Sequence, residues 1–178
     1  MAVKTEQRVP VPKNQIDTIT LRAYQEVDYA QVLALWEQAK LRPFTEAEVL
    51  RLLASGGQAL VALRDTNECK DEDKNEVRAN RNYSSEDAVT QVVGVVLWSH
   101  NGSIGILWRL AVAETVRGRG IATRLLDRAE QDIRAAGLSG VTLLTRVDNT
   151  IAKGMYTRRG YRWNEHLEFW GKKLPDSV

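Results

Sequence analysis

The most informative segment of the sequence reads Leu110-Ala-Val112-Ala-Glu-Thr-Val-Arg117-Gly-Arg-Gly120-Ile-Ala122. Its first part is apolar and typical of a strand, its second part is a tight Arg/Gly turn, and an amphipathic helical pattern follows at once. Backbone N–H groups at the start of a helix lack partners within the helix, and the helix dipole favours negative charge there. Gly118 and Gly120 let an anion approach the main chain without meeting a Cβ atom. The segment therefore predicts a site for a phosphate or pyrophosphate group.

Two common phosphate-binding motifs do not fit this turn. A Walker loop needs Gly-Lys followed by Ser or Thr, and neither tripeptide occurs in the chain. A dinucleotide fingerprint needs Gly or Ala where Thr123 stands, and an acidic residue where Ser139 stands. Taken alone, the turn is also compatible with a plain tight connection into a packed helix.

A second constellation lies in Asn149-Thr-Ile-Ala152-Lys-Gly-Met-Tyr156-Thr-Arg-Arg-Gly160-Tyr161. Asn149 is a natural helix N-cap, and Gly160 is a natural helix end. Ala152 and Tyr156 are four residues apart and therefore share one helical face. From the pattern alone, Tyr156 is equally a core tyrosine with a satisfied hydroxyl group.

The remaining patterns predict an α/β (α+β) domain with a largely antiparallel sheet. Strands are expected over residues 19–23, 59–63, 92–98, 104–112 and 141–147, with closing strands over 161–165 and 167–174. Helices are expected near residues 29–39, after a Thr45–Glu48 capping box, and over 121–136 and 150–159. The Asn101-Gly102 pair predicts a hairpin turn.

Length and composition predict one domain. The chain has 178 residues, of which 43% are apolar and 27% are charged. Residues 1–17 are polar and predict a mobile tail, and residues 18–175 form the predicted domain, with an acidic loop insertion over 65–90. Neither a secretory signal nor a membrane span is visible, so the expected location is the cytoplasm.

The charge balance and the scarcity of metal ligands exclude further classes of function. A net charge of +2 favours neither nucleic acid nor membrane as a partner. Residues 103–178 hold 13 basic and 8 acidic groups, so the part with the predicted anion site is the basic part. Cys69 is the only cysteine, lies in a polar tract and is expected to be an exposed bystander. Because the chain has one cysteine and two histidines, it cannot form a Cys₄ or Cys₂His₂ zinc site, and no metal is expected.

Together, the two segments closely resemble the signatures of the GNAT superfamily of acyl-CoA-dependent N-acetyltransferases. The family's Arg/Gln-x-x-Gly-x-Gly/Ala signature, which binds the coenzyme A pyrophosphate, is matched at Arg117, Gly120 and Ala122. Its Asn-x-x-Ala-x-x-x-Tyr-x-x-x-Gly-Phe/Tyr signature is matched at Asn149, Ala152, Tyr156, Gly160 and Tyr161. The resemblance covers residues 19–174. It implies a mixed, mostly antiparallel sheet of about seven strands, splayed between the fourth and fifth, with about four flanking helices.

Within the superfamily, four short segments resemble the small bacterial YpeA-like acetyltransferases. They are Leu35-Trp36, Leu41-Arg-Pro-Phe44, Gly154-Met-Tyr156 and the ending Gly171-Lys-Lys-Leu174. The ribosomal-protein N-terminal alanine acetyltransferases are the alternative branch.

The resemblance implies that acetyl-CoA lies across a gap between strands 104–112 and 141–147. The residues implied to bind it are Leu110, Ala111, Val112, Arg117, Gly118, Arg119, Gly120, Ile121, Ala122, Thr123, Asn149, Lys153 and Tyr156. An amine would attack the thioester directly, with Tyr156 as the general acid for the departing thiolate. The backbone amide of Val112 would polarise the thioester carbonyl.

The acceptor is expected to be a primary amine, on a small molecule or a protein N-terminus, bound between the first two helices and the 98–108 hairpin. The candidates to line that pocket are Trp36, Phe44, Trp98 and Trp108. Trp163 and Trp170 are expected to pack the closing strands instead. The sequence does not decide whether the protein is a monomer or a homodimer.

The resemblance does not identify a general base in this chain. Family members often carry glutamate at the position that Trp108 occupies here. Glu114 and His100 are minor candidates for the base. An α-amine, with a reference pKa of about 8, needs less help from a base than a lysine side chain at about 10.4. The missing carboxylate leaves a second reading open, in which the domain binds acyl-CoA as a sensor or interaction module without turnover.

Overall fold

The computed structural model describes residues 18–65, 90–168 and 170–172. The chain divides after Leu143 into two compact units. The first unit holds the sheet and most of the helices, and the second, from Leu144, holds one helix. The predicted mobile tail (1–17), nearly all of the acidic loop (66–89) and Cys69 lie outside the described residues. The expectation of a single domain over 18–175 stays a prediction.

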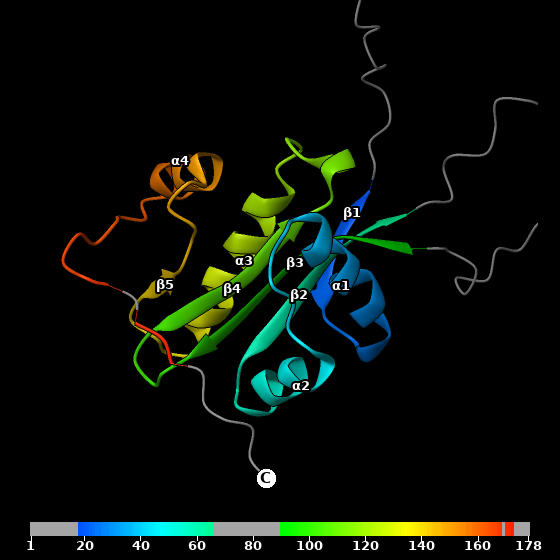
Figure 1. Ribbon diagram of the computed structural model, residues 1–178. Helices are drawn as coiled ribbons and strands as arrows, with labels where there is room; N and C mark the ends of the chain where they lie inside the picture. Colours follow the sequence, from blue (N-terminus) through cyan, green and yellow to red (C-terminus); the bar gives the residue numbers. More distant parts are fainter. Residues whose placement is uncertain (1–17, 66–89, 169, 173–178) are drawn as a thin grey trace, which may run out of the picture. The chain divides into compact units, whose positions relative to one another are not determined.

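The first unit is built on a mixed sheet of five strands in the order β1-β2-β3-β4-β5 (Figure 1). The strands are β1 (Ile19–Ala23), β2 (Gln58–Asp65), β3 (Thr90–His100), β4 (Gly105–Val112) and β5 (Val141–Leu143). The pairs from β1 to β4 are antiparallel, and β5 joins β4 in parallel. The apolar runs of β2 and β3 are buried, as expected for central strands. The predicted α/β class and mostly antiparallel sheet are confirmed.

Helices cover both faces of this sheet. They are η1 (Glu26–Asp28), α1 (Tyr29–Gln38), α2 (Glu46–Ala54), η2 (Glu114–Val116) and α3 (Ile121–Ala135). In Figure 1, α3 and α1 lie on opposite sides of the sheet. Glycines make room for α3, because a Cβ atom on Gly105 would lie 2.7 Å from Ile133 Cδ1. None of the helices in the described ranges combines the length and the apolar character needed to cross a bilayer.

Local signals place the helix ends where the sequence predicts them. The capping box of α2 forms: Glu48 N–H donates to Thr45 Oγ1 at 3.2 Å, and Thr45 N–H donates to the Glu48 carboxylate at 2.7 Å. Gly102, in the hairpin, has a φ of +90°. The face of α3 formed by Ile121, Leu125, Ala129 and Ile133 is buried as expected, whereas Ala136 is exposed beyond the helix end.

Two predictions about strands at the C-terminal end are wrong in the described residues. Residues 161–168 and 170–172 form no strand. Asn164 Oδ1 instead accepts the N–H of His166 at 3.0 Å, and such a local turn competes with pairing in a sheet. Trp163 and Trp170 therefore have no closing strands to pack in this region. The fifth strand ends at Leu143 rather than at Val147, because only its first three residues find partners on β4.

Candidate active site

Strand β4 carries an irregularity at Arg109. Val95 is opposite Ala111 and Leu97 is opposite Trp108, so the single residue between them on β3 faces two residues of β4. Arg109 has a φ of +52°, in the left-handed region that costs a non-glycine residue about 1–2 kcal/mol. The indole N–H of Trp36 donates to the Arg109 carbonyl at 3.0 Å and holds this bulge in place. The strand therefore changes direction between its two halves.

Beyond the bulge, one edge of β4 has no strand beside it among the described residues, and we call it the open edge. β5 pairs only with Gly105, Ile106 and Leu107. The N–H of Ala113 donates to the Val93 carbonyl at 2.9 Å, so by alternation the N–H and C=O of Val112 point away from β3. The Val112 carbonyl accepts instead from Arg117 Nε at 3.2 Å. Main-chain groups on this edge are thus placed to pair with an extended ligand, as a further strand would.

The open edge leads into the glycine turn at the start of α3. Gly118 and Gly120 have φ values of +79° and +78°, which glycine adopts without strain. The first hydrogen bond of the helix runs from Arg124 N–H to the Gly120 carbonyl at 3.0 Å. The N–H groups of residues 121–123 therefore have no acceptor within the helix.

The cap of α3 differs from those of two other helices in the described residues. The side chain of Thr45 accepts a backbone N–H at the start of α2, and that of Asn149 does so at the start of α4 (Thr150–Arg158). Gly120, the N-cap of α3, has no side chain to do this. Its Cβ position has no protein atom within 4 Å, so there is open space in front of the turn. This N-terminus is suited to an anion from outside the chain.

The two arginines of the turn are both exposed. Arg117 donates to the Glu114 carboxylate at 3.0 Å in addition to its contact with Val112. These contacts leave its guanidinium at the edge of the turn, where an anion would be bound. Whether Arg117 and Arg119 contact the coenzyme stays a prediction.

The second unit holds the tyrosine of the second signature. Asn149 Oδ1 accepts the N–H of Ala152 at 3.1 Å, and the Lys153 ammonium donates to the Val147 carbonyl, so both predicted coenzyme ligands make local bonds at the start of α4. Burial raises the pKa of Tyr156 above that of an ordinary phenol. Its ring meets the ring of Tyr161 edge to face, with 5.6 Å between centroids. Tyr156 is thus kept in the protonated form that a proton donor needs.

These features can be compared with known proteins. The profile of the acetyltransferase (GNAT) family matches residues 34–161. This chain belongs to the acetyltransferase (GNAT) family. The GNAT match spans both β4 with its glycine turn and the α4 segment, so it includes both signatures.

Solved structures of GNAT proteins share the fold. The aminoglycoside 6'-N-acetyltransferase AAC(6')-IG from Acinetobacter haemolyticus is 22% identical, with 88% of this chain and 99% of that chain covered and a TM-score of 0.59. A GNAT-family acetyltransferase from Staphylococcus aureus Mu50 is 17% identical, with coverages of 89% and 95% and a TM-score of 0.61. The aminoglycoside N-acetyltransferase AAC(6')-Iy in complex with CoA is 16% identical, with coverages of 90% and 99% and a TM-score of 0.65.

A shallow cavity, wide open to solvent, lies between α2 and the β3–β4 hairpin. Its volume is about 310 Å³, and it is lined by Phe44, Glu48, Arg51, Leu52, Ser55, Ser99 and Trp108. The Trp108 indole N–H donates to Ser99 Oγ at 2.7 Å, and its ring lies 6.3 Å from that of Phe44. We call this the Phe44–Trp108 cavity.

Two of the four aromatic residues predicted to line the acceptor pocket are in the core instead. Trp36 is fully buried and supports the bulge through its bond to Arg109. Trp98 is buried too, and it is paired with Leu107, next to the Leu97–Trp108 pair. Because neighbouring residues in a strand alternate, Trp98 and Trp108 lie on opposite faces of the sheet.

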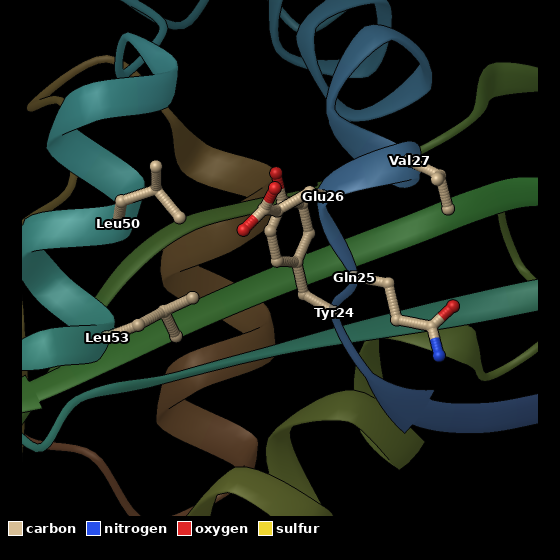
Figure 2. Close-up of a pocket in the computed structure, with 6 residues that line it drawn as sticks. All are labelled: Tyr24, Gln25, Glu26, Val27, Leu50 and Leu53. Atoms are coloured by element: carbon tan, nitrogen blue, oxygen red, sulfur yellow. The ribbon is translucent and has the colours of Figure 1, made fainter.

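A second cavity lies between η1 and α2. It has a volume of about 490 Å³ and is lined by Tyr24, Gln25, Glu26, Val27, Leu50 and Leu53 (Figure 2). Burial, and then the carboxylates of Glu46, Asp28 and Glu26, raise the pKa of Tyr24 to about 12. Its phenol oxygen is buried without a hydrogen-bond partner among the described residues. The surroundings of this cavity are acidic.

None of the predicted candidates is placed as a strong general base. Glu114 is paired with Arg117, and His100 Nδ1 accepts the N–H of Gly102 at 3.2 Å in the hairpin. Glu48 lines the Phe44–Trp108 cavity, but the backbone N–H of Thr45 lowers the pKa of its carboxyl group. Within residues 18–65, 90–168 and 170–172, no cluster of acidic, histidine or cysteine side chains could hold a metal ion.

Sequence reasoning missed the residues around the bulge. Arg109, Arg51, Glu48 and Ser99 were not among the predicted site residues, although they surround Phe44 and Trp108. Only the Glu48 capping box carried a local signal. The others are recognisable only once the strand register is known.

Proposed function

We propose that this GNAT protein is an acetyl-CoA-dependent N-acetyltransferase that moves the acetyl group to a primary amine. The observation that carries the proposal is the open edge of β4 at Val112, which continues into a helix N-terminus capped only by glycine. An extended pantetheine arm could pair with that edge while the pyrophosphate occupies the turn. Binding of CoA by a structural neighbour, AAC(6')-Iy, supports this assignment.

The proposed reaction is direct transfer within a ternary complex. The lone pair of a neutral amine attacks the thioester carbonyl carbon, the Val112 N–H stabilises the charge that develops on the oxygen, and the C–S bond then breaks. The departing thiolate takes the phenolic proton of Tyr156, the positively charged nitrogen of the new amide loses a proton to water, and the Tyr156 phenolate regains a proton from solvent. The raised pKa of Tyr156 supports its part in this scheme.

Release of free CoA thiol from acetyl-CoA, measured across a panel of amines, peptides and aminoglycosides, tests the proposal. The expected result is thiol release that depends on one class of acceptor and on Tyr156. Calorimetric titration of acetyl-CoA should be run on the same protein.

One alternative has an observation in its favour. Trp108 occupies the position where the family often has a carboxylate, so the domain could bind acyl-CoA as a sensor without turnover. Tight acetyl-CoA binding with no thiol release for any acceptor would support the sensor. Absence of both binding and release would contradict both functions.

A further inference from the structure

We infer that the acceptor is a small amine that also bears a carboxylate, recognised in the Phe44–Trp108 cavity by a group of arginines that includes Arg109. This inference rests on the proposed N-acetyltransferase function and adds the chemical class of its acceptor. It excludes polycationic acceptors such as aminoglycosides, the substrates that the names of several structural neighbours state.

The first observation is the state of Arg109. Its guanidinium lies over the ring of Phe44, 4.5 Å from the centroid, in a cation–π contact with a residue that lines the cavity. The side chain is half-buried, its Nε is buried with no hydrogen-bond partner, and no carboxylate in the described ranges pairs with it. Burial, and then the charge of Arg42, lower its pKa, against a smaller opposite effect of the Glu48 carboxylate. A half-buried guanidinium with an unpaired Nε is stabilised by an anion that hydrogen-bonds to it.

The second observation is the balance of charge around the cavity. Arg51 lines it, and Arg42 acts electrostatically on both Arg109 and Glu48. The only carboxylate in the cavity wall is that of Glu48, which the amide of Thr45 already engages at 2.7 Å. One guanidinium therefore lines the cavity, that of Arg51, and two more act on residues of its wall, Arg109 on Phe44 and Arg42 on Glu48. A polycation would be repelled here, whereas an anion would be attracted.

The third observation is the size and position of the cavity. About 310 Å³ is at the small end of ligand pockets and suits a molecule the size of an amino acid. Trp108 in the cavity wall is four residues from Val112 on the same strand, a span of at most about 13 Å. The carboxylate would be held near Arg109 and the amine would point along β4 toward the thioester. The cavity of Figure 2 has no arginine among its lining residues, and it lies between η1 and α2 rather than beside β4.

Matched pairs of ligands test the inference without any need for turnover. The probes are the common α-amino acids, the same compounds as C-terminal amides, and kanamycin as a polycation, each titrated into the whole protein by calorimetry. At least one amino acid should bind about ten times more tightly than its amide. Equal binding of every acid and amide pair, binding of none, or a preference for kanamycin would overturn the inference.

Variants connect the preference to the arginines. Arg109→Gln should reduce the acid-to-amide preference to about threefold or less. Arg51→Glu changes an exposed side chain, so it spares the fold, and it should reverse the preference toward the amide. Arg124→Gln, on α3, is the matched control and should retain the preference of the unchanged protein. If Arg51→Glu and Arg109→Gln both kept that preference, these arginines would not be the recognition group.

The same titrations separate this inference from the proposed function. Failure of acetyl-CoA to bind, together with a clear acid-over-amide preference, would contradict only the transferase. Thiol release with amides and aminoglycosides, but not with free amino acids, would contradict only the acceptor class.

Discussion

The two halves of β4 differ in how many neighbouring strands their main chain pairs with. Gly105, Ile106 and Leu107 are paired on both sides, with β3 on one edge and β5 on the other. After Arg109, the strand keeps β3 as a neighbour but has no strand on its other edge within the described residues. The first half therefore lies between two strands, whereas the second half has a strand along one edge only (Figure 1).

The residue that separates the halves explains why both can coexist. Arg109 takes a left-handed conformation, and its carbonyl accepts a bond from Trp36, which lies 73 positions away in the sequence. A strained residue persists only where its surroundings fix it, and such residues concentrate at functional sites. The bulge therefore frees one edge of β4 without giving up the pairing with β3.

The largest effect is expected from proline at Val112. The N–H of Val112 faces the open edge, so Val112→Pro removes a proposed oxyanion donor while the ladder to β3 stays intact. We expect kcat/KM for acetyl transfer to fall about 10²–10³-fold with little change in Tm. Ala111→Pro is the matched control, because alternation directs its N–H to β3, and it should lower Tm markedly. Similar loss of stability in both variants would contradict the distinction between the two edges.

A somewhat smaller effect is expected at Tyr156, whose proposed role is to protonate the departing thiolate rather than to stabilise the thioester oxygen. Tyr156→Phe should lower kcat about 10²-fold and leave the Kd of coenzyme A within about twofold. Because burial raises the pKa of this phenol, the protonated acid persists as pH rises, and the alkaline limb of kcat should lie above the ordinary phenol value of about 10. Tyr161→Phe, its ring partner, is the control. Unchanged turnover in Tyr156→Phe would remove the residue from the mechanism.

Much of the sheet and its helices could be predicted because their signals are local. β1 has the predicted bounds, and the Thr45–Glu48 box starts α2 through hydrogen bonds within four residues. The glycine turn before α3 was also recognisable, since its left-handed positions need glycine. Periodicity and capping signals are enough to predict a helix or strand wherever residues close in sequence determine its conformation.

The features that shape the candidate site were not predictable in this way. No glycine or proline marks the bulge, and a tertiary bond from Trp36 supports it. The face on which Trp98 lies depends on strand register, which the alternation within one strand does not give. The prediction of closing strands did not take account of the local turn in which Asn164 accepts the N–H of His166. Each failure comes from an interaction that the periodic pattern does not contain.

An intermediate effect is expected at the turn into which the open half of β4 leads. Gly120 and Gly137 lie near opposite ends of α3 with φ values of +78° and +77°, and a Cβ atom would meet no protein atom at either. Gly120→Ala and Gly137→Ala should each cost about 1–2 kcal/mol of unfolding free energy. Only Gly120→Ala should weaken coenzyme A, by about tenfold, because its methyl group enters the space in front of the helix N-terminus. Equal coenzyme affinity in both variants would place the pyrophosphate elsewhere.

The smallest effect is expected from Glu114, which keeps Arg117 beside the open edge. Their ion pair is 3.0 Å long with both side chains half exposed, and such a pair contributes about 0–1 kcal/mol to stability. Glu114→Gln should hardly change Tm. By removing a negative charge next to the anion site, it should tighten coenzyme A about two- to fivefold at low salt, a gain that fades at high salt.

Calorimetry at both salt concentrations measures this gain, with Glu37→Gln on α1 as a control that removes an exposed carboxylate from a different element. Weaker binding in Glu114→Gln would mean that the carboxylate orients Arg117 for the pyrophosphate. The contact between Arg117 and the Val112 carbonyl would then be part of the binding-competent edge, whereas tighter binding would mean that the coenzyme displaces it.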